Sequence, residues 1–536
     1  MNQIEILPEL AVVPTGRPVR VELRGPAAGE LRARHLGRVV ASRRVDGPGL
    51  VDLGVLAPGG YGVELAHDGE LWRTAIDVQT DPAHRLRYGF VASYLPGRDP
   101  TPVADQVRRL HLTGIQFYDW AYRHADLLGG GEDYADPLGQ PISLATVHSL
   151  VQAVQRAGAA ALGYAAVYGV GNAEWPGWSH DALLQPDGTP YGLGDFLQLV
   201  DPAAPDWLQH FLDDLAAAVD RLEFDGFHLD QYGYPKWAVR RDGVVVDVAA
   251  SFDTLIRAAR ERLPMARLVF NQVNDFPTGQ LAGSPQDAVY IEPWEPQTTL
   301  AALAATVQRA QAAAPGRPVV LAAYQQVYDS VPDEVGDRST ALTMAALFSH
   351  GATQLLAGEA GRILVDPYYV RNHEAAPSTL ALLKRWYDFL VEHDELLMDP
   401  AARDVTAALA GSYNDDCDVT YAGSVVAGQA EAGTVWRRIV ELPDRLVVHL
   451  INLTGQPDTA WDAPREPMPV VAGGRLRLRC VGEAVPRVLV ADPDGDGYLQ
   501  PVPVVRDGNH AHAQLPPLGV WQVVSVVLLP REEPAP

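Results

Sequence analysis

The sequence of 536 residues has few cysteines, few basic residues and no long apolar run. Its two cysteines, Cys417 and Cys480, stand far apart without metal-ligand spacing, so we interpret them as small buried side chains and leave a disulfide between them open. Only 42 basic residues accompany 67 acidic ones, and the formal charge is −25. This charge disfavours phosphate backbones and anionic lipids, so we expect no nucleic acid and no membrane partner. A neutral sugar polymer is a more suitable partner for a protein of this charge.

Several signatures of other protein classes are also absent. No stretch reaches the roughly 18 apolar residues that span a bilayer. The start, MNQIEILPEL, lacks the basic and apolar regions of a secretory signal, so the protein as given is expected to be cytoplasmic, or extracellular if a leader was trimmed. The HExxH, CxxC, Walker, GxGxxG and GxSxG motifs are missing, so we expect no metal, no cofactor and no serine-hydrolase chemistry. The sequence carries no signal for an oligomeric state.

The composition, 47% apolar and 20% charged, is that of a folded chain long enough for two or three domains. Short alternating runs separated by Pro and Gly turns predict a small β-sandwich over residues 1–84. Apolar strands that alternate with helical stretches predict one (β/α)₈ barrel over residues 85–398. The alternating pattern returns over residues 399–536 and predicts a second β-sandwich.

Eight strands are expected in the barrel, and a long insertion after the third, residues 168–210, is expected to wall its mouth. The expected strands are RYGFVASY (87–94), GIQFYDW (114–120), AAALGYAAV (159–167), FDGFHLD (224–230), RLVFNQ (267–272), AVYIE (288–292), RPVVLAAY (317–324) and ATQLLAG (352–358).

Two of these strands end on a carboxylate, Asp230 and Glu292, each followed by aromatic residues. In a parallel barrel only the carboxyl end of a strand reaches the substrate mouth, so both side chains are candidates for chemistry. A pair of carboxylates is what cleavage of a glycosidic bond requires, with Asp230 suited to attack and Glu292, between apolar neighbours, suited to act as the acid. Glu295 lies three residues further on and remains an alternative acid.

Aromatic and polar residues near the strand ends predict a carbohydrate cleft, because sugar rings stack on aromatic faces and their hydroxyls need fixed polar partners. The expected aromatic positions are Trp120, Trp175, Trp178, Tyr232, Trp237 and Trp294. The expected polar positions are Asp119, Tyr122 and His124 after the second strand, Asn271 and Asn274 after the fifth, and Asp366 with Tyr368 after the eighth.

Four runs together resemble glycoside hydrolase family 66: HLTGIQFYDWAYRH (111–124), LVDPAAPDWLQHF (199–211), FDGFHLDQYG (224–233) and AVYIEPWE (288–295). That family contains dextranases and cycloisomaltooligosaccharide glucanotransferases, which act on α-1,6-linked glucans with retention of configuration. The resemblance implies an immunoglobulin-like N-terminal domain, a catalytic (β/α)₈ barrel and a C-terminal β-sandwich. By position, it implies that Asp230 is the nucleophile and Glu292 the acid/base. The offset of 62 residues between them is short for the family, which keeps Glu295 open.

The resemblance also bears on the reaction. The glucanotransferase branch carries a carbohydrate-binding module after strand seven, whereas only residues 325–351 separate the expected strands seven and eight here. We therefore expect a dextranase-like hydrolase acting on dextran or isomaltooligosaccharides, and the missing export signal favours an imported isomaltooligosaccharide. The alternatives are a transglycosylase that makes cyclic or elongated isomaltooligosaccharides, and a carbohydrate-binding protein without catalysis on a degenerate barrel.

Overall fold

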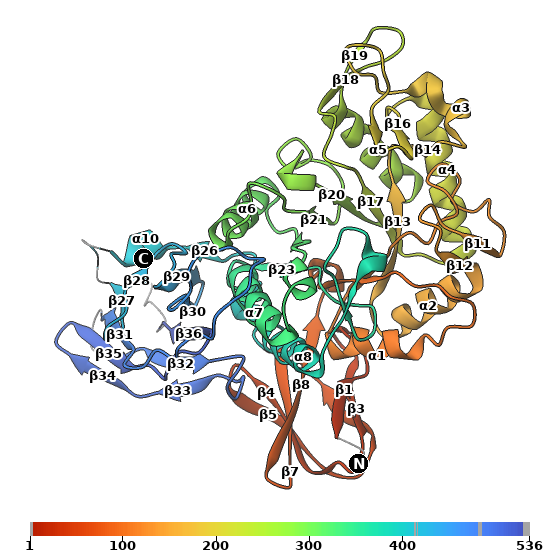
Figure 1. Cartoon of the computed structure of the whole chain (residues 1–536). Helices are drawn as coiled ribbons and strands as arrows, with labels where there is room; N and C mark the ends of the chain where they lie inside the picture. Colours follow the sequence, from red (N-terminus) through yellow and green to blue (C-terminus); the bar gives the residue numbers. More distant parts are fainter. Residues whose placement is uncertain (1–3, 412–413, 415, 481–484, 529–536) are drawn as a thin grey trace, which may run out of the picture.

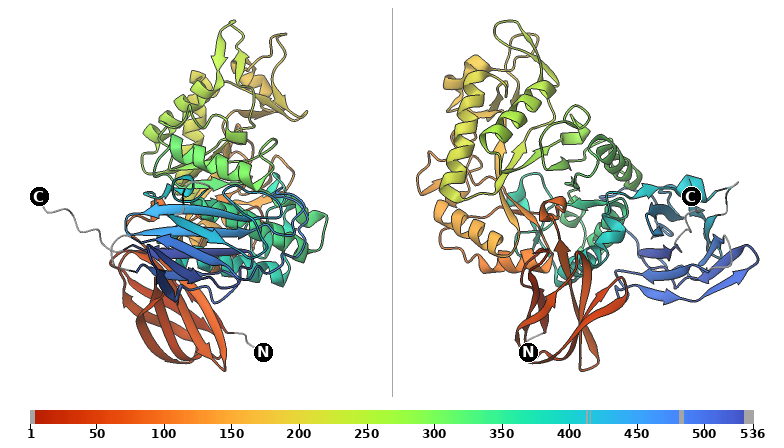
Figure 2. Two further views of the ribbon diagram at one scale, coloured as in Figure 1. Left: turned by 90° about the vertical axis from the view of Figure 1, so that its left-hand side faces the viewer. Right: turned by 180° about the vertical axis from the view of Figure 1, so that it is seen from behind.

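The computed structural model describes residues 4–411, 414, 416–480 and 485–528. A parallel barrel forms the centre of the molecule, with one β-sandwich below it and another at its side (Figure 1). The two further views in Figure 2 show both sandwiches against the barrel. This architecture confirms the predicted fold class, while the domain limits near residues 84 and 398 stay sequence predictions.

The N-terminal sandwich pairs a three-stranded sheet, β1-β3-β6, with a five-stranded sheet, β2-β8-β7-β4-β5. Alternate residues of its strands point into one apolar core, as Val19, Val21 and Leu23 do in β3. The strands are β1 (Glu5–Pro8), β2 (Val13–Pro14), β3 (Pro18–Arg24), β4 (Ala28–His35), β5 (Arg38–Asp46), β6 (Gly49–Val55), β7 (Gly59–His67) and β8 (Glu70–Gln79).

The barrel sheet has eight strands in the order β23-β22-β21-β20-β17-β13-β10-β9, and all seven pairings are parallel. The ring closes where the Phe90 amide donates to the Ala357 carbonyl at 3.2 Å. All eight strands expected from the sequence are confirmed. They are β9 (Tyr88–Val91), β10 (Gly114–Phe117), β13 (Ala160–Ala166), β17 (Gly226–Asp230), β20 (Arg267–Asn271), β21 (Ala288–Ile291), β22 (Val319–Leu321) and β23 (Ala352–Gln354).

Helices surround this sheet, and most of them bury one apolar stripe, whereas the second half of α7 (Asp333–Ser349) is buried on all sides. In α4 (Pro205–Leu222), the longest helix, the apolar stripe includes Trp207, Phe211 and Leu215. Pro205 occupies its first turn, where no amide donor is needed. The main helices are α1 (Thr101–Arg109), α2 (Leu144–Arg156), α4 (Pro205–Leu222), α5 (Val248–Arg262), α6 (Leu300–Ala313), α7 (Asp333–Ser349) and α8 (Pro377–Glu392). Across the described residues, none of the helices has the length and apolar character needed to cross a bilayer.

Short elements occupy the loops between strands and helices. The helical ones are η1 (Pro82–His84), α3 (Trp175–Trp178), η2 (Ser179–Asp181), η3 (Val273–Asp275), η4 (Gln326–Asp329), η5 (Tyr369–Arg371), α9 (Asp394–Leu397) and α10 (Thr406–Leu409). The extended ones are β11 (Asp133–Ala135) with β12 (Pro141–Ser143), β14 (Gly169–Gly171) and β15 (Gly192–Leu193) with β16 (Leu197–Leu199), β18 (Trp237–Val239) with β19 (Val245–Asp247), and β24 (Arg362–Ile363) with β25 (His373–Glu374). Most of them follow the carboxyl ends of barrel strands.

The C-terminal sandwich pairs a seven-stranded sheet with the four-stranded sheet β27-β31-β35-β34. Cys417 is buried in its core, Cys480 is partly exposed, and both are free thiols, so the disulfide left open by the sequence does not form. The strands are β26 (Arg403–Asp404), β27 (Cys417–Thr420), β28 (Val426–Ala427), β29 (Val435–Leu442), β30 (Arg445–Asn452), β31 (Arg475–Arg479), β32 (Arg487–Ala491), β33 (Gln500–Val502), β34 (Val504–Asp507), β35 (His510–Gln514) and β36 (Trp521–Val527).

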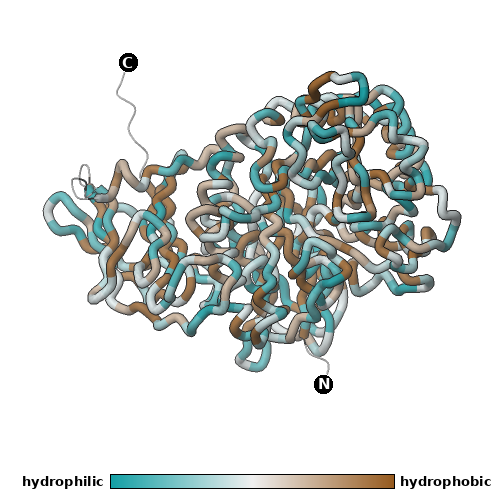
Figure 3. Tube along the Cα trace, turned by 45° about the horizontal axis from the view of Figure 1, so that its top comes forward, coloured by the Kyte–Doolittle hydropathy of each residue, from teal (hydrophilic) through white to brown (hydrophobic). Residues whose placement is uncertain are grey.

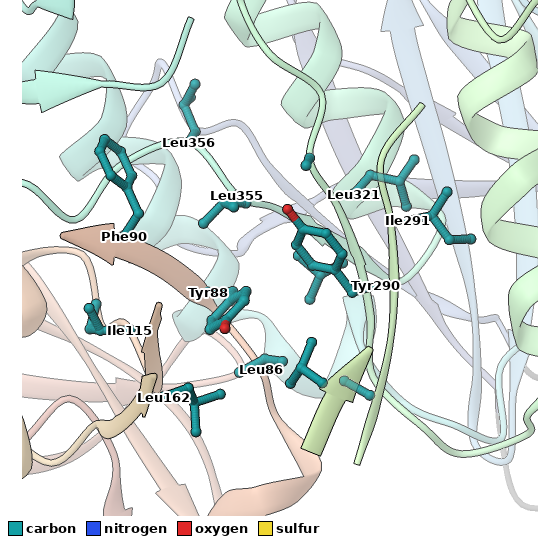
Figure 4. Close-up of a cluster of buried hydrophobic side chains, with 14 of the residues drawn as sticks. Leu86, Tyr88, Phe90, Ile115, Leu162, Tyr290, Ile291, Leu321, Leu355 and Leu356 are labelled. Atoms are coloured by element: carbon teal, nitrogen blue, oxygen red, sulfur yellow. The ribbon is translucent and has the colours of Figure 1, made fainter. Parts of the chain in front are cut away.

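Apolar segments run through the middle of the molecule (Figure 3). Inside the barrel, Tyr88 and Tyr290 point toward each other among leucine and isoleucine side chains (Figure 4), with ring centroids 6.0 Å apart. His228 lies 4.7 Å from Tyr290 in the same layer. These rings fill the barrel below its mouth, so the space above them has a rigid floor.

Gly226, the first residue of β17, lies in close contact with the neighbouring strand β20. A Cβ atom there would lie 2.0 Å from the Arg267 carbonyl oxygen. We expect Gly226→Ala to destabilise the fold by about 3 kcal/mol, because β17 must move away from β20. The matched control is Gly177→Ala, where no atom lies within 4 Å. Thermal unfolding of both variants checks this, and equal midpoints would contradict it.

Candidate active site

Three neighbouring strands bring two carboxylates together at the mouth of the barrel. Asp230 is the last residue of β17, Asn271 is the last of β20, and Glu292 directly follows β21. The Asn271 Nδ2 group donates to Asp230 Oδ1 at 2.7 Å and to Glu292 Oε2 at 2.9 Å. Because both oxygens bond to one nitrogen, they lie at most about 5.6 Å apart. Retaining glycosidases hold their two carboxyl groups about 5 to 5.5 Å apart.

Burial raises the pKa of both carboxyl groups by a similar amount. Asp230 is partly exposed to the cleft, and desolvation raises its pKa to about 6 against the opposing effect of its hydrogen bonds. Glu292 is buried, and desolvation together with the nearby charge of Asp230 raises its pKa to about 7. Because the pKa of Asp230 stays below that of Glu292, the pair is suited to separate roles, with Asp230 ionised and Glu292 protonated.

Each carboxylate also has a tyrosine of its own. The Tyr164 hydroxyl, from β13, donates to Asp230 Oδ2 at 2.8 Å. The Tyr324 hydroxyl, just after β22, donates to Glu292 Oε1 at 2.8 Å. With the bonds from Asn271, both oxygens of each carboxylate have a partner. The side chains are therefore fixed in orientation before any substrate binds.

Asp119 and His124 bring further polar groups into the same space. Asp119 has a left-handed backbone with φ of 43°, which is unusual for a residue other than glycine and turns the chain at the mouth. Desolvation, with the charges of Asp136 and Asp230, raises the pKa of Asp119 well above its usual value. Burial lowers the pKa of His124 to about 4, so its ring is neutral at neutral pH. Both can exchange hydrogen bonds with hydroxyl groups.

The cleft above the two carboxylates has aromatic walls. Of the residues expected at a binding site, the structure brings Asp119, His124, Tyr232, Asn271, Trp294 and Tyr368 to this cleft with Asp230 and Glu292. Trp294 is 38% exposed, which leaves much of its ring free to meet a ligand. The insertion after the third strand contributes Leu193, Phe196 and Leu197, as its predicted role as a wall requires.

Other expected positions do not line the cleft. Trp120 is fully buried, and its Nε1 donates to the Tyr164 carbonyl at 3.1 Å. The prediction that its ring stacks on a sugar is therefore wrong. Tyr122 packs edge-on against Tyr134, and Trp175 begins α3 and packs on the barrel core. These three positions fail because side chains after a strand end point either inward or outward, and sequence spacing does not distinguish the two.

Three more polar or acidic positions support loops instead. Glu295 is exposed and absent from the cleft lining, so the structure does not bring it to Asp230 as an alternative acid. The Asn274 Nδ2 group donates to the Glu295 carbonyl at 2.7 Å and its Oδ1 accepts from the Trp294 amide at 3.2 Å, which holds that loop in place. Asp366 accepts the Tyr368 amide at 2.7 Å.

Two further tryptophans expected at the cleft lie elsewhere. Trp178 packs edge-on against Trp207 with ring centroids 5.1 Å apart, beside α4. Trp237 is 61% exposed on the β18–β19 hairpin and does not line the cleft.

Sequence reasoning missed the tyrosines that surround the carboxylates. In the sequence, Tyr164 and Tyr324 stand within or at the end of apolar strand runs, and no pattern marks Tyr118 and Tyr369, whose ring centroids lie 4.2 Å apart in the cleft. A signal existed for Tyr324, because it ends its expected strand just as Asp230 and Glu292 end theirs. No comparable signal marks Tyr164, which lies within an apolar run.

The described part of the chain has no group of three or more His, Cys, Asp or Glu side chains placed to hold a metal ion. The side chains that line the cleft supply carboxyl, hydroxyl, amide and imidazole groups together with aromatic rings.

The chain also resembles known proteins. A model of glycosyl hydrolase family 66 matches residues 56–525. The chain belongs to this family. The resemblance recognised in four sequence runs is thereby confirmed, and the match covers the barrel, most of the C-terminal sandwich and the last two strands of the N-terminal one.

Two relatives from Niallia circulans match a smaller part of the chain. One cycloisomaltooligosaccharide glucanotransferase is 27% identical over 302 residues, which is 51% of this chain and 31% of that protein. A second is 25% identical over 299 residues, which is 50% of this chain and 31% of that protein. The match thus spans about a third of the length of each of these relatives.

Solved structures extend the likeness to the whole fold. A cycloisomaltooligosaccharide glucanotransferase of Paenibacillus sp., complexed with cycloisomaltoheptaose, superposes with a TM-score of 0.87 at 19% identity, covering 98% of this chain and 100% of that chain. An α-amylase from Geobacillus thermoleovorans gives 0.52 at 12% identity, covering 85% of this chain and 100% of that chain. At these identities the likeness shows the fold.

Proposed function

We propose that the protein is a retaining glycoside hydrolase that cleaves α-1,6-glucosidic bonds in dextran or isomaltooligosaccharides. The observation that carries this proposal is the pair Asp230 and Glu292, whose oxygens bonded to one amide group lie at most about 5.6 Å apart, a separation that fits a nucleophile and an acid/base. Membership of glycosyl hydrolase family 66 and the likeness to an enzyme complexed with cycloisomaltoheptaose support the linkage.

The first step forms a covalent bond to the enzyme. An Asp230 oxygen attacks the anomeric carbon while the bond from that carbon to the leaving glucan oxygen breaks. Glu292 gives its proton to that oxygen, which its raised pKa permits near neutral pH. The Tyr164 hydroxyl holds the other Asp230 oxygen, which keeps the attacking oxygen in line.

The second step releases the sugar. Glu292, now ionised, takes a proton from water, and the water oxygen bonds to the anomeric carbon as the ester bond to Asp230 breaks. Two inversions give net retention of the α configuration. The rings of Trp294, Tyr232 and Tyr368 offer faces for the sugars on either side of the bond.

Hydrolysis is favoured over cyclisation by the short connection between β22 and β23. That connection consists of η4 and α7 with their loops, without room for an inserted module. The second candidate function is transglycosylation to cyclic or elongated isomaltooligosaccharides, because both Niallia circulans relatives are glucanotransferases. The two differ only in whether water or a sugar hydroxyl attacks the glycosyl ester.

Incubation with dextran and with isomaltooligosaccharides tests the proposal. We expect linear shorter products whose new reducing ends are first detected by NMR as the α anomer. Asp230→Asn and Glu292→Gln should each lower turnover of these glucans by roughly 10²–10⁴-fold or more, because each removes an essential protonation state. Glu295→Gln, which changes the exposed carboxylate outside the cleft lining, serves as the control and should stay active.

Cyclic or elongated products would favour the second function instead. Intact glucans after incubation with folded protein would contradict both functions.

The pH dependence of kcat/KM follows from the two carboxyl groups. Asp230 must be ionised, so activity should fall below its pKa of about 6, and Glu292 must be protonated, so activity should fall above its pKa of about 7. We expect a narrow bell centred near pH 6.5, about midway between the two values. Glu292→Gln, assayed with an aryl glucoside that needs no acid, should lose only the basic limb. A basic limb that persists in this variant would contradict the assignment.

A further inference from the structure

We propose that Asn271 is a positioning residue whose side-chain NH₂ group stabilises the one negative charge of the reaction as that charge moves from Asp230 to Glu292 and back. This inference rests on the proposed function. It replaces the sequence-based expectation that Asn271 binds substrate.

The geometry leaves Asn271 little freedom. It is 4% exposed at the end of β20, between β17 and β21, and Leu229 pairs with Phe270 just before the two site residues. Its NH₂ group has two hydrogens, and each is used by a different carboxylate. Its Oδ1 is buried without a hydrogen-bond partner. The reverse orientation would place that oxygen against two acceptors, so the structure favours the bonds to the carboxylates at the cost of an unsatisfied carbonyl.

The reaction moves a charge between these two partners of Asn271. Before reaction Asp230 is ionised and Glu292 protonated, and after the first step Asp230 is a neutral ester and Glu292 is ionised. Water then returns a proton to Glu292 and the electron pair of the ester bond returns to Asp230. The pair therefore holds one negative charge at every stage, always on a group that accepts from Asn271 Nδ2.

The other groups around the pair do not serve both sides in this way. Asp230 is faced by Asp119, Tyr118, Tyr164 and Tyr232, and Glu292 by Tyr290, Tyr324 and Trp294, with Tyr369 near both. The raised pKa of each of these tyrosines, with the lowered pKa of His124 and His228, leaves them uncharged near neutral pH. Burial, with the charges of Asp136 and Asp230, also raises the pKa of Asp119. Among the residues that the structure describes, Asn271 is the side chain that donates hydrogen bonds to both carboxylates.

A donor shared in this way sets the pKa of both groups. Its hydrogen bonds stabilise the ionised forms and so hold each pKa below the value that burial alone would give. Without the amide, ionisation of Asp230 and of Glu292 should both need a higher pH. A residue that merely supports the fold would not move either value.

The test compares pH profiles of kcat/KM for Asn271→Leu, similar in size, and Asn271→Asp, which adds a third carboxyl. For Asn271→Leu we expect both limbs to move up by about one pH unit and turnover to fall by about 10- to 100-fold. Asn271→Asp should move them further in the same direction, because like charges disfavour ionisation. Wild-type protein and an isomaltooligosaccharide substrate provide the reference.

The control variant is Gln272→Met. Gln272 is fully buried beside Asn271 and donates to Gln286 at 3.3 Å, without a bond to either carboxylate. We expect its profile to keep both wild-type limbs. Asn271 variants that lose turnover but keep the wild-type limbs would overturn the inference and leave the proposed function intact. Wild-type protein that cleaves no α-1,6-glucan would overturn both.

Discussion

One amide group shared between two carboxylates is the interaction on which the site depends. It requires three strands, β17, β20 and β21, to be adjacent and parallel, with their carboxyl ends at one level. Parallel strands in a closed barrel supply that arrangement, because every carboxyl end opens on the same face. The aromatic layer of Tyr88, His228 and Tyr290 beneath it prevents the strands from collapsing inward. The distances between Asp230, Asn271 and Glu292 at the mouth therefore depend on the whole barrel.

Burial and hydrogen bonding act in opposite directions on the same two groups. Desolvation alone favours neutral carboxyls, whereas the donors from Asn271, Tyr164 and Tyr324 favour ionised ones. Their balance leaves Asp230 the stronger acid and Glu292 the weaker one. The hydroxyls of the surrounding tyrosines add no charge, which suits a cleft for neutral sugars in a protein whose net charge is −25.

The fold was predictable because its signals are local. The barrel strands are buried runs of three to seven residues, and most of the outer helices show one apolar stripe. The position of Asp230 and Glu292 at the mouth of the barrel was predictable for the same reason, because each stands at the carboxyl end of a buried strand. What could not be predicted is side-chain direction beyond the strand end. Trp120 turns into the core, whereas Asp119, one residue earlier, adopts a left-handed backbone and faces the cleft.

The hydrogen-bond network was also beyond the sequence. That Asn271 would reach two carboxylates at once depends on the stagger between β20 and its neighbours, which no single run encodes. Tyr164 reads as one more apolar residue of its strand, and only the closed barrel brings its hydroxyl to Asp230. The pairing of residues from different strands is where sequence reasoning reached its limit.

The central claim is that Asp230 attacks the sugar and Glu292 is the acid/base. Azide rescue tests it most directly, with an activated α-glucosyl substrate and the variants Asp230→Ala and Glu292→Ala. With Asp230→Ala, azide should attack the sugar directly and give the β-glucosyl azide. With Glu292→Ala, azide should attack the glycosyl ester and give the α-glucosyl azide. The opposite pairing of variants and anomers, or the same anomer from both, would contradict the account.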